Sequence, residues 1–175
     1  MKRTDKHLIS PTVVRMTVKN DDDFLSSFST GDEPVISTEV AEFIENATAA
    51  LPPMTPLALH VYSDCIDETE KTEYTKAIRN YYREKYVASE IERKHNSRIV
   101  LLLALVGILI LSLALLLDAN AHFLWAEVID IAAWVFLWEA VDIAAFRNRD
   151  LRINRMRYRA FLSMPAVYHP LERSR

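Results

Sequence analysis

Polar and apolar positions divide the chain into a mixed amino-terminal half and a strongly apolar stretch at residues 99–146. The first apolar run, Ile99–Leu117, has nineteen consecutive residues without a charge. A helix of that length spans about 28 Å, close to the roughly 30 Å hydrocarbon core of a bilayer. The second run, residues 122–146, is also long enough to span, and a polar break at residues 118–121 separates the two. The pattern therefore predicts a two-helix transmembrane hairpin.

The pattern before this hairpin predicts a small α/β unit. Alternation of apolar and polar residues predicts strands at Thr12–Val18 and Leu57–Ser63. Helical spacing and capping residues predict one helix between Ser37 and Leu51 and a second from about Asp67 to Asn96. The sequence leaves open whether the second helix continues into the first span or breaks near Asn96.

Two strands alone make a poor sheet, so a third is expected. The candidate is Ala166–His169, which lies between two prolines. If this strand pairs with the other two, both ends of the chain lie on the same side of the membrane. The expected fold class is an α+β membrane protein, with a small cytoplasmic α/β domain on a two-helix transmembrane hairpin. Its expected parts are a tail at 1–10, the domain at 11–97, the hairpin at 98–146 and an Arg-rich tail at 147–175.

The distribution of basic residues predicts the orientation of the hairpin. Arg93, Lys94 and Arg98 precede the first span, many arginines follow the second, and the connection has no Lys or Arg. The positive-inside rule then places both termini in the cytoplasm. The alternative is a monotopic or soluble buried hairpin, because the second run is acidic.

The arginines after the second run are candidate contacts for anionic lipid headgroups, since basic residues near a membrane surface contribute about 1 kcal/mol each. A topology signal with no further role explains the same charges equally well. The four candidate residues are Arg147, Arg149, Arg152 and Arg155.

Four acidic residues of the second run are the first candidates for function, because ionisable groups inside a membrane segment are expensive. They are Glu127, Asp130, Glu139 and Asp142. Counting about 100° per residue places all but Glu139 on one face, together with Trp134 and Trp138. That face is either a seam for self-association or for a proton or cation path, or an interfacial surface whose acids snorkel. Trp125, Trp134 and Trp138 are the expected aromatic anchors.

Small residues form a stripe on each apolar run, and small residues let helices approach closely in lipid. We expect the two stripes to pack against each other within the hairpin. One stripe consists of Ala104, Gly107 and Ala114, and the other of Ala126, Ala133, Ala140 and Ala144.

Signals of catalysis are weak. Cys65 is the single cysteine, which excludes an internal disulfide, and the two glycines exclude a Gly-rich phosphate loop. His60, with Asp64, Cys65 and Asp67 after it, is the one cluster that resembles a nucleophile and base, and no nucleophile motif supports it. We expect no enzyme activity, no metal or cofactor and no nucleic-acid partner. The basic amino terminus lacks the apolar segment of a cleaved signal peptide.

Four stretches resemble an uncharacterised bacterial family of small two-span membrane proteins. They read STEVAEFI (37–44), PLALHVYSD (56–64), AIRNYY (77–82) and WVFLWEAVDI (134–143). The resemblance covers most of residues 11–168 and implies the architecture above, in a bacterial inner membrane. It carries no established activity.

The function expected from these features is that of a non-enzymatic integral membrane protein. Its cytoplasmic domain binds a partner or transmits a signal to the membrane, and its hairpin contacts lipid and associates with itself or with another membrane protein. The alternative is a membrane effector, or an oligomer that conducts protons or cations along the acidic face of the second span.

Overall fold

The computed structural model describes residues 10–119 and 123–171. Within this range the chain divides into two compact units. The sheet unit comprises residues 10–86 and 156–171, and the helical unit comprises Val87–Arg155. The chain combines helices with a small parallel sheet, so the predicted α+β class is confirmed.

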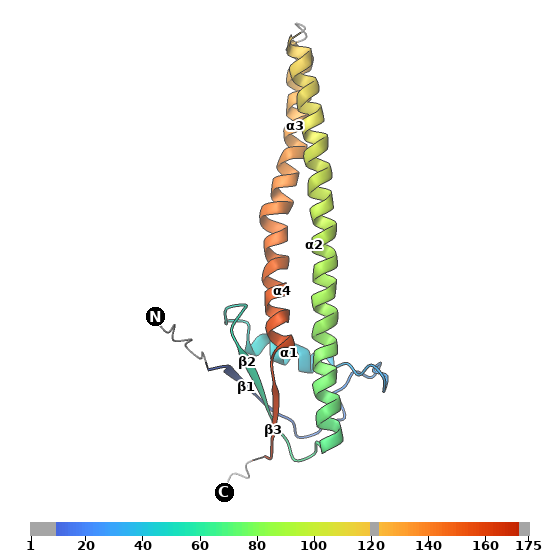
Figure 1. The fold of residues 1–175 in the computed structure, drawn as a ribbon, viewed down its shortest axis with the longest axis vertical. Helices are drawn as coiled ribbons and strands as arrows, with labels where there is room; N and C mark the ends of the chain where they lie inside the picture. The colour runs from blue at the N-terminus through green and yellow to red at the C-terminus, as the bar shows by residue number, and fades with distance from the viewer. Residues whose placement is uncertain (1–9, 120–122, 172–175) are drawn as a thin grey trace, which may run out of the picture. The chain divides into compact units, whose positions relative to one another are not determined.

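Three strands form the sheet, in the order β1 (Thr12–Thr17), β2 (Leu57–Tyr62) and β3 (Ala166–His169), as Figure 1 shows. β1 pairs in parallel with all of β2, and β3 pairs in parallel with the second half of β2. The predicted strands are therefore confirmed, including the third, which comes from the far end of the chain.

Local capping explains where the first two helices begin. α1 (Thr38–Ala47) follows Ser37, whose hydroxyl accepts a backbone N–H of the first turn. α2 (Glu68–Ala119) begins with a reciprocal cap. The backbone N–H of Glu70 donates to Oδ1 of Asp67 at 2.8 Å, and the Glu70 carboxylate accepts from the backbone N–H of Asp67 at 2.7 Å.

The structure decides the question that the sequence left open at Asn96 and adds a helix after the second apolar run. α2 is unbroken through Asn96. α3 (Phe123–Asp142) passes through a π-helical turn, η1 (Ile143–Arg147), into α4 (Asn148–Leu162). Residues 147–162, expected as part of an Arg-rich tail, are helical because they contain no glycine or proline and many arginines, which favour helix.

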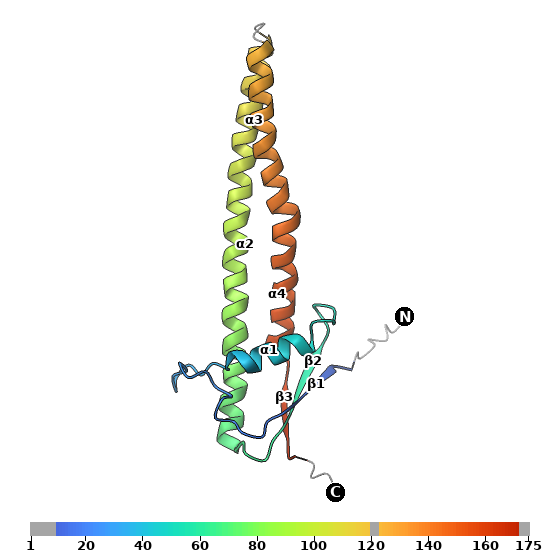
Figure 2. The ribbon, with the colours of Figure 1, turned by 180° about the vertical axis from the view of Figure 1, so that it is seen from behind.

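The core of the sheet unit lies on one face of the sheet. The alternate strand residues predicted to face inward, such as Met16 and Leu59, are buried there against α1, the start of α2 and the end of α4. Figure 2 shows α1 beside the first part of α2. The largest fully buried side chains are Ile36, Ile44, Leu59, Val61, Tyr82 and Phe161.

The other face of the sheet carries partly exposed side chains. Val13 of β1 and Val167 of β3 are 38% and 39% exposed, and His60 and Tyr62 of β2 are half-buried between them. Parallel sheets in globular proteins are usually covered on both faces. This open face distinguishes the sheet unit from the ordinary pattern.

Tyr82 provides a test of the core. Its hydroxyl is buried without a hydrogen-bond partner among the described residues. Burial, and secondly the negative charge of Glu45, raise the pKa of Tyr82 far above its ordinary value. The folded state therefore favours the neutral phenol. This contribution to stability is present below the unfolded pKa of about 10 and is lost as the pH rises toward the folded pKa.

We expect Tyr82→Phe to leave stability at pH 7 unchanged or higher by up to about 1 kcal/mol, because an unsatisfied buried hydroxyl is removed. Above pH 10 the variant should become more stable than the parent. The measurement is thermal unfolding of the full chain in mild detergent at pH 7 and 10.5, with Tyr62→Phe on the open face as control. A larger alkaline loss in the variant would contradict the assignment.

Candidate functional site

One helix of the described chain is long and apolar enough to cross a membrane, judged by length and composition. This helix is α2, and its apolar stretch contains the predicted first span, Ile99–Leu117. Only 11% of its most apolar part is buried within the chain. A core helix of a soluble protein would be mostly covered, whereas most of this apolar surface is uncovered in the described structure. α3 does not meet the same criteria because it carries four carboxylates.

Within the helical unit, α3 packs closely against α2. A Cβ added at Gly107 would lie 2.8 Å from the side chain of Leu137 and 3.4 Å from the carbonyl oxygen of Ala133. Small residues of both helices are buried as well, namely Ala114 on α2 and Ala126, Ala133 and Ala140 on α3. These are members of the two small-residue stripes of the sequence analysis.

The stripe on α3 ends one alanine earlier than the sequence analysis predicted, at Ala140. Ala140 is buried, but Ala144 is exposed and Ile143 is buried instead. This change coincides with the start of the π-helical turn η1 at Ile143. A π turn has more residues per turn than an α-helix and so shifts every later side chain around the axis.

The acidic residues of α3 lie outside the row of buried alanines. Glu127 and Glu139 are exposed, and Asp130 and Asp142 are half-buried. None of the four forms an ion pair or hydrogen bond with a residue in the ranges 10–119 and 123–171. The indole rings around them are exposed as well, at 67% for Trp125, 59% for Trp134 and 70% for Trp138.

The four candidate headgroup arginines differ in their surroundings. Arg147, Arg149 and Arg152 are exposed. Arg155 is half-buried, and its Nη1 lies 3.0 Å from Oε2 of Glu90. Arg155 is therefore held by a carboxylate, and the other three are the ones that present their charge to solvent.

Glu90 is the centre of a polar group in the helical unit. It accepts a hydrogen bond from Arg93 Nη2 at 3.2 Å, and Lys94 Nζ lies 3.8 Å from the same carboxylate. The hydrogen bond from Arg93, then the charge of Arg155, lower the pKa of Glu90 below its usual value. Asn96 is also buried, and its amide nitrogen has no partner among the described residues.

The members of the cluster that resembled a nucleophile and base have different hydrogen-bond partners in the structure. His60 Nδ1 lies 2.9 Å from Nε2 of His169, which comes from β3. The thiol of Cys65 lies 3.0 Å from the hydroxyl of Ser63, and the backbone N–H of Leu171 donates to Asp64. The sequence could not indicate the histidine pair, because it depends on the register between β2 and β3. Within the described ranges, no three His, Cys, Asp or Glu side chains are arranged to hold a metal ion.

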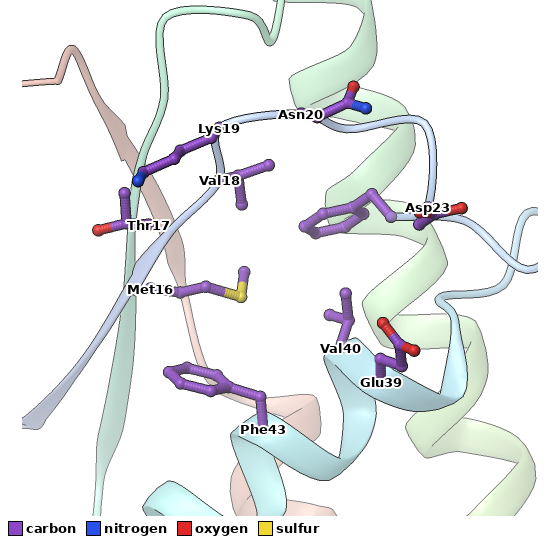
Figure 3. Close-up of a pocket in the computed structure, with 10 residues that line it drawn as sticks. Met16, Thr17, Val18, Lys19, Asn20, Asp23, Glu39, Val40 and Phe43 are labelled. Carbon is purple, nitrogen blue, oxygen red and sulfur yellow. The ribbon is translucent and has the colours of Figure 1, made fainter.

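A cavity of about 490 Å³ opens between the end of β1 and α1 in the sheet unit (Figure 3). Met16 and Val18 line it from the strand, and Val40 and Phe43 line it from α1. Lys19, Asp23 and Glu39 stand at its rim, with the lysine on the side away from the two carboxylates. The sequence analysis did not single out this cavity, since it required the packing of α1 against β1.

Comparisons with protein-family models, with curated proteins and with solved structures find no match for this chain. The resemblance to a two-span bacterial family stays a prediction.

Ala133 allows a test of the packing between α2 and α3. It is fully buried, whereas the neighbouring Ala132 is exposed. Ala133→Leu should destabilise the helical unit by about 1–3 kcal/mol because the added side chain overpacks a close helix contact. Ala132→Leu is the matched control and should have little effect. Both are measured as the unfolding temperature of the full chain in detergent. Equal effects of the two variants would refute this packing.

Proposed function

We propose that this chain is a non-enzymatic protein of a bacterial inner membrane that spans the bilayer twice and self-associates. In this proposal α2 and α3 form the transmembrane hairpin, both termini lie in the cytoplasm, and the sheet unit binds a protein partner there. The observation that carries the proposal is which side of α3 contacts α2. Its small residues make this contact, and its acidic and tryptophan side chains lie outside it.

The parallel pairing of β3 with β2 supports an even number of spans. The chain passes from β2 into α2 and comes back to the sheet through α4 and β3. A strand that pairs with β2 lies on the same side of a membrane as β2. If α2 crosses once, the chain must therefore cross again before β3, and α3 is the segment available for it. The basic residues on both flanks support a cytoplasmic location for the two ends.

The outward carboxylates support self-association. A carboxylate exposed to lipid costs several kcal/mol near the centre of a bilayer. The small-residue face of α3 is already occupied by α2, and the chain itself covers Asp130 only in part and leaves Glu139 exposed. A second copy can bury these groups against its own polar or protonated side chains, with Trp134 and Trp138 beside them. We therefore assign the outward face of α3 as the contact between copies.

An oligomer that conducts protons or cations is the second candidate. The same outward face would then line a path, because several carboxylates follow one another along α3. The two candidates differ in one respect, since only the conducting oligomer requires ion flux that depends on Asp130 and Glu139.

The exposed single cysteine provides a test of the membrane topology. Cys65 lies in the sheet unit and is exposed. In intact bacterial cells whose outer membrane has been permeabilised, a membrane-impermeant maleimide should leave Cys65 unlabelled, and labelling should appear once the inner membrane is opened. A Cys65→Ser, Asn120→Cys variant should show the opposite behaviour, because the connection between the spans is expected outside. The protein should also resist alkaline carbonate extraction. Labelling of Cys65 in intact cells would overturn the orientation.

Asp130→Asn with Glu139→Gln tests the assembly. We expect the native mass of the particle in mild detergent to fall from a discrete oligomer toward the monomer, since the polar contacts that cover these groups are weakened. Glu92→Gln, on an exposed position of α2, is the control and should leave the mass unchanged. Unchanged assembly with loss of ion flux in liposomes would favour the conducting oligomer. A parent protein that is monomeric would refute self-association.

A further inference from the structure

The exposed edge of β1 and the cavity beside it form one continuous surface of the sheet unit. β1 has a single neighbour in the sheet, β2. The backbone N–H of Thr12 donates to Pro56 at 2.8 Å, and that of Val18 donates to Tyr62 at 2.9 Å, so these alternate residues face β2. In a parallel strand the residues between them direct their N–H and C=O groups the other way. Val13, Arg15 and Thr17 therefore present backbone groups along an unpaired edge.

The cavity lies along the same edge. Five consecutive residues line it, namely the last two of β1, Met16 and Thr17, and the three that follow the strand, Val18 to Asn20. The cavity is thus walled by the edge of the strand, and α1 forms the opposite wall through Val40 and Phe43. Figure 3 shows Met16 and these two side chains directed into the same space. An extended chain laid against β1 would direct every second side chain into it.

The rim of the cavity has a defined charge. Asp23 and Glu39 stand together on one side, and neither forms an ion pair with a described residue. A smaller hollow of about 320 Å³ shares these two carboxylates and adds Asp22. Together the two hollows are lined by three carboxylates and by one ammonium group, that of Lys19. The complementary ligand carries a positive charge next to an apolar side chain.

We propose that the β1–α1 groove, lined by Met16, Val40, Phe43, Asp23 and Glu39, binds an extended basic segment of a partner protein by strand addition to β1. The partner's backbone pairs with Val13, Arg15 and Thr17, an apolar side chain fills the space between Met16 and Phe43, and a Lys or Arg reaches the two carboxylates. This inference rests on the proposed function, because it names the site and class of the cytoplasmic partner.

The edge and the groove together are needed for this assignment. An uncovered edge strand alone favours pairing with any extended chain, and the carboxylates at the end of the groove select a basic one. β3, the other edge of the sheet, does not line this cavity. The groove therefore distinguishes one edge from the other.

The test uses the full chain in mild detergent and two displayed peptide libraries. In both libraries the peptides alternate apolar and variable positions. The variable positions carry Lys and Arg in the basic library and Asp and Glu in the acidic library. We expect enrichment from the basic library only. A selected peptide, followed by fluorescence polarisation, should bind about tenfold more weakly to Phe43→Ser and to Asp23→Asn with Glu39→Gln. Phe28→Ser and Glu42→Gln, exposed positions outside the cavity, are the controls and should bind as the parent does.

Methylation of the peptide's own backbone amides tests the binding mode without changing the protein. Strand addition predicts that methylation of every second amide abolishes binding and that methylation of the amides between them has little effect. Sensitivity with the period of a helix, preference for the acidic library, or no enrichment from either would overturn the proposal, as would equal weakening by the control variants. Peptide binding in detergent is measured independently of the membrane labelling and of the native mass. A failure to bind peptide therefore does not contradict the proposed topology and self-association. A failure of those two tests likewise does not contradict the peptide site.

Discussion

The parallel pairing of β3 with β2 is the interaction on which the rest of the structure depends. Leu59 lies opposite Ala166, and the helices α2, α3 and α4 all belong to the chain between the two strands. Without this pairing the sheet would have two short strands, which are marginal by themselves in water. The pairing also brings Phe161 and Met164 into the core of the sheet unit, next to Tyr82. A strand at the carboxyl end of the chain thus completes a unit that begins at the amino end.

The helical unit depends on a different contact, the close approach at Gly107. Leu137 and the backbone of Ala133 occupy the space that any larger side chain at this position would need. Close approach increases dispersion contacts between helices, which matters in lipid because water provides no driving force for helix association there. One face of α3 is thereby used internally, and its carboxylates have no ion-pair partner among the described residues.

The two proposals apply the same physical rule to unpaired carboxylates in two different environments. Polar groups that have no partner in the chain are expensive in lipid and cheap in water. On α3 the unpaired carboxylates indicate association, because the proposed environment is apolar. At the β1–α1 groove the unpaired Asp23 and Glu39 are hydrated, so they select a ligand charge and contribute modestly to affinity.

Much of this fold was predictable from local pattern. Alternation along Thr12–Val18 and Leu57–Ser63 identified two strands and their inward faces, and the prolines around Ala166–His169 identified the third. The small-residue stripes identified the packed sides of α2 and α3 up to Ala140. These features are encoded by the spacing of apolar residues within one element, and that spacing can be read without knowing what the element contacts.

Contacts between elements decided the rest. The pairing of His60 with His169 follows from strand register, and the groove exists because α1 packs beside an edge strand. The exposure of Ala144, at the π turn, was also not indicated by the sequence. The sequence likewise placed His60 near Cys65 along the chain, whereas the strand directs their side chains to different partners. Apolar periodicity states which side of an element is buried. It does not state which neighbour buries it, and only the tertiary structure decides that because the choice depends on the packing of many residues at once.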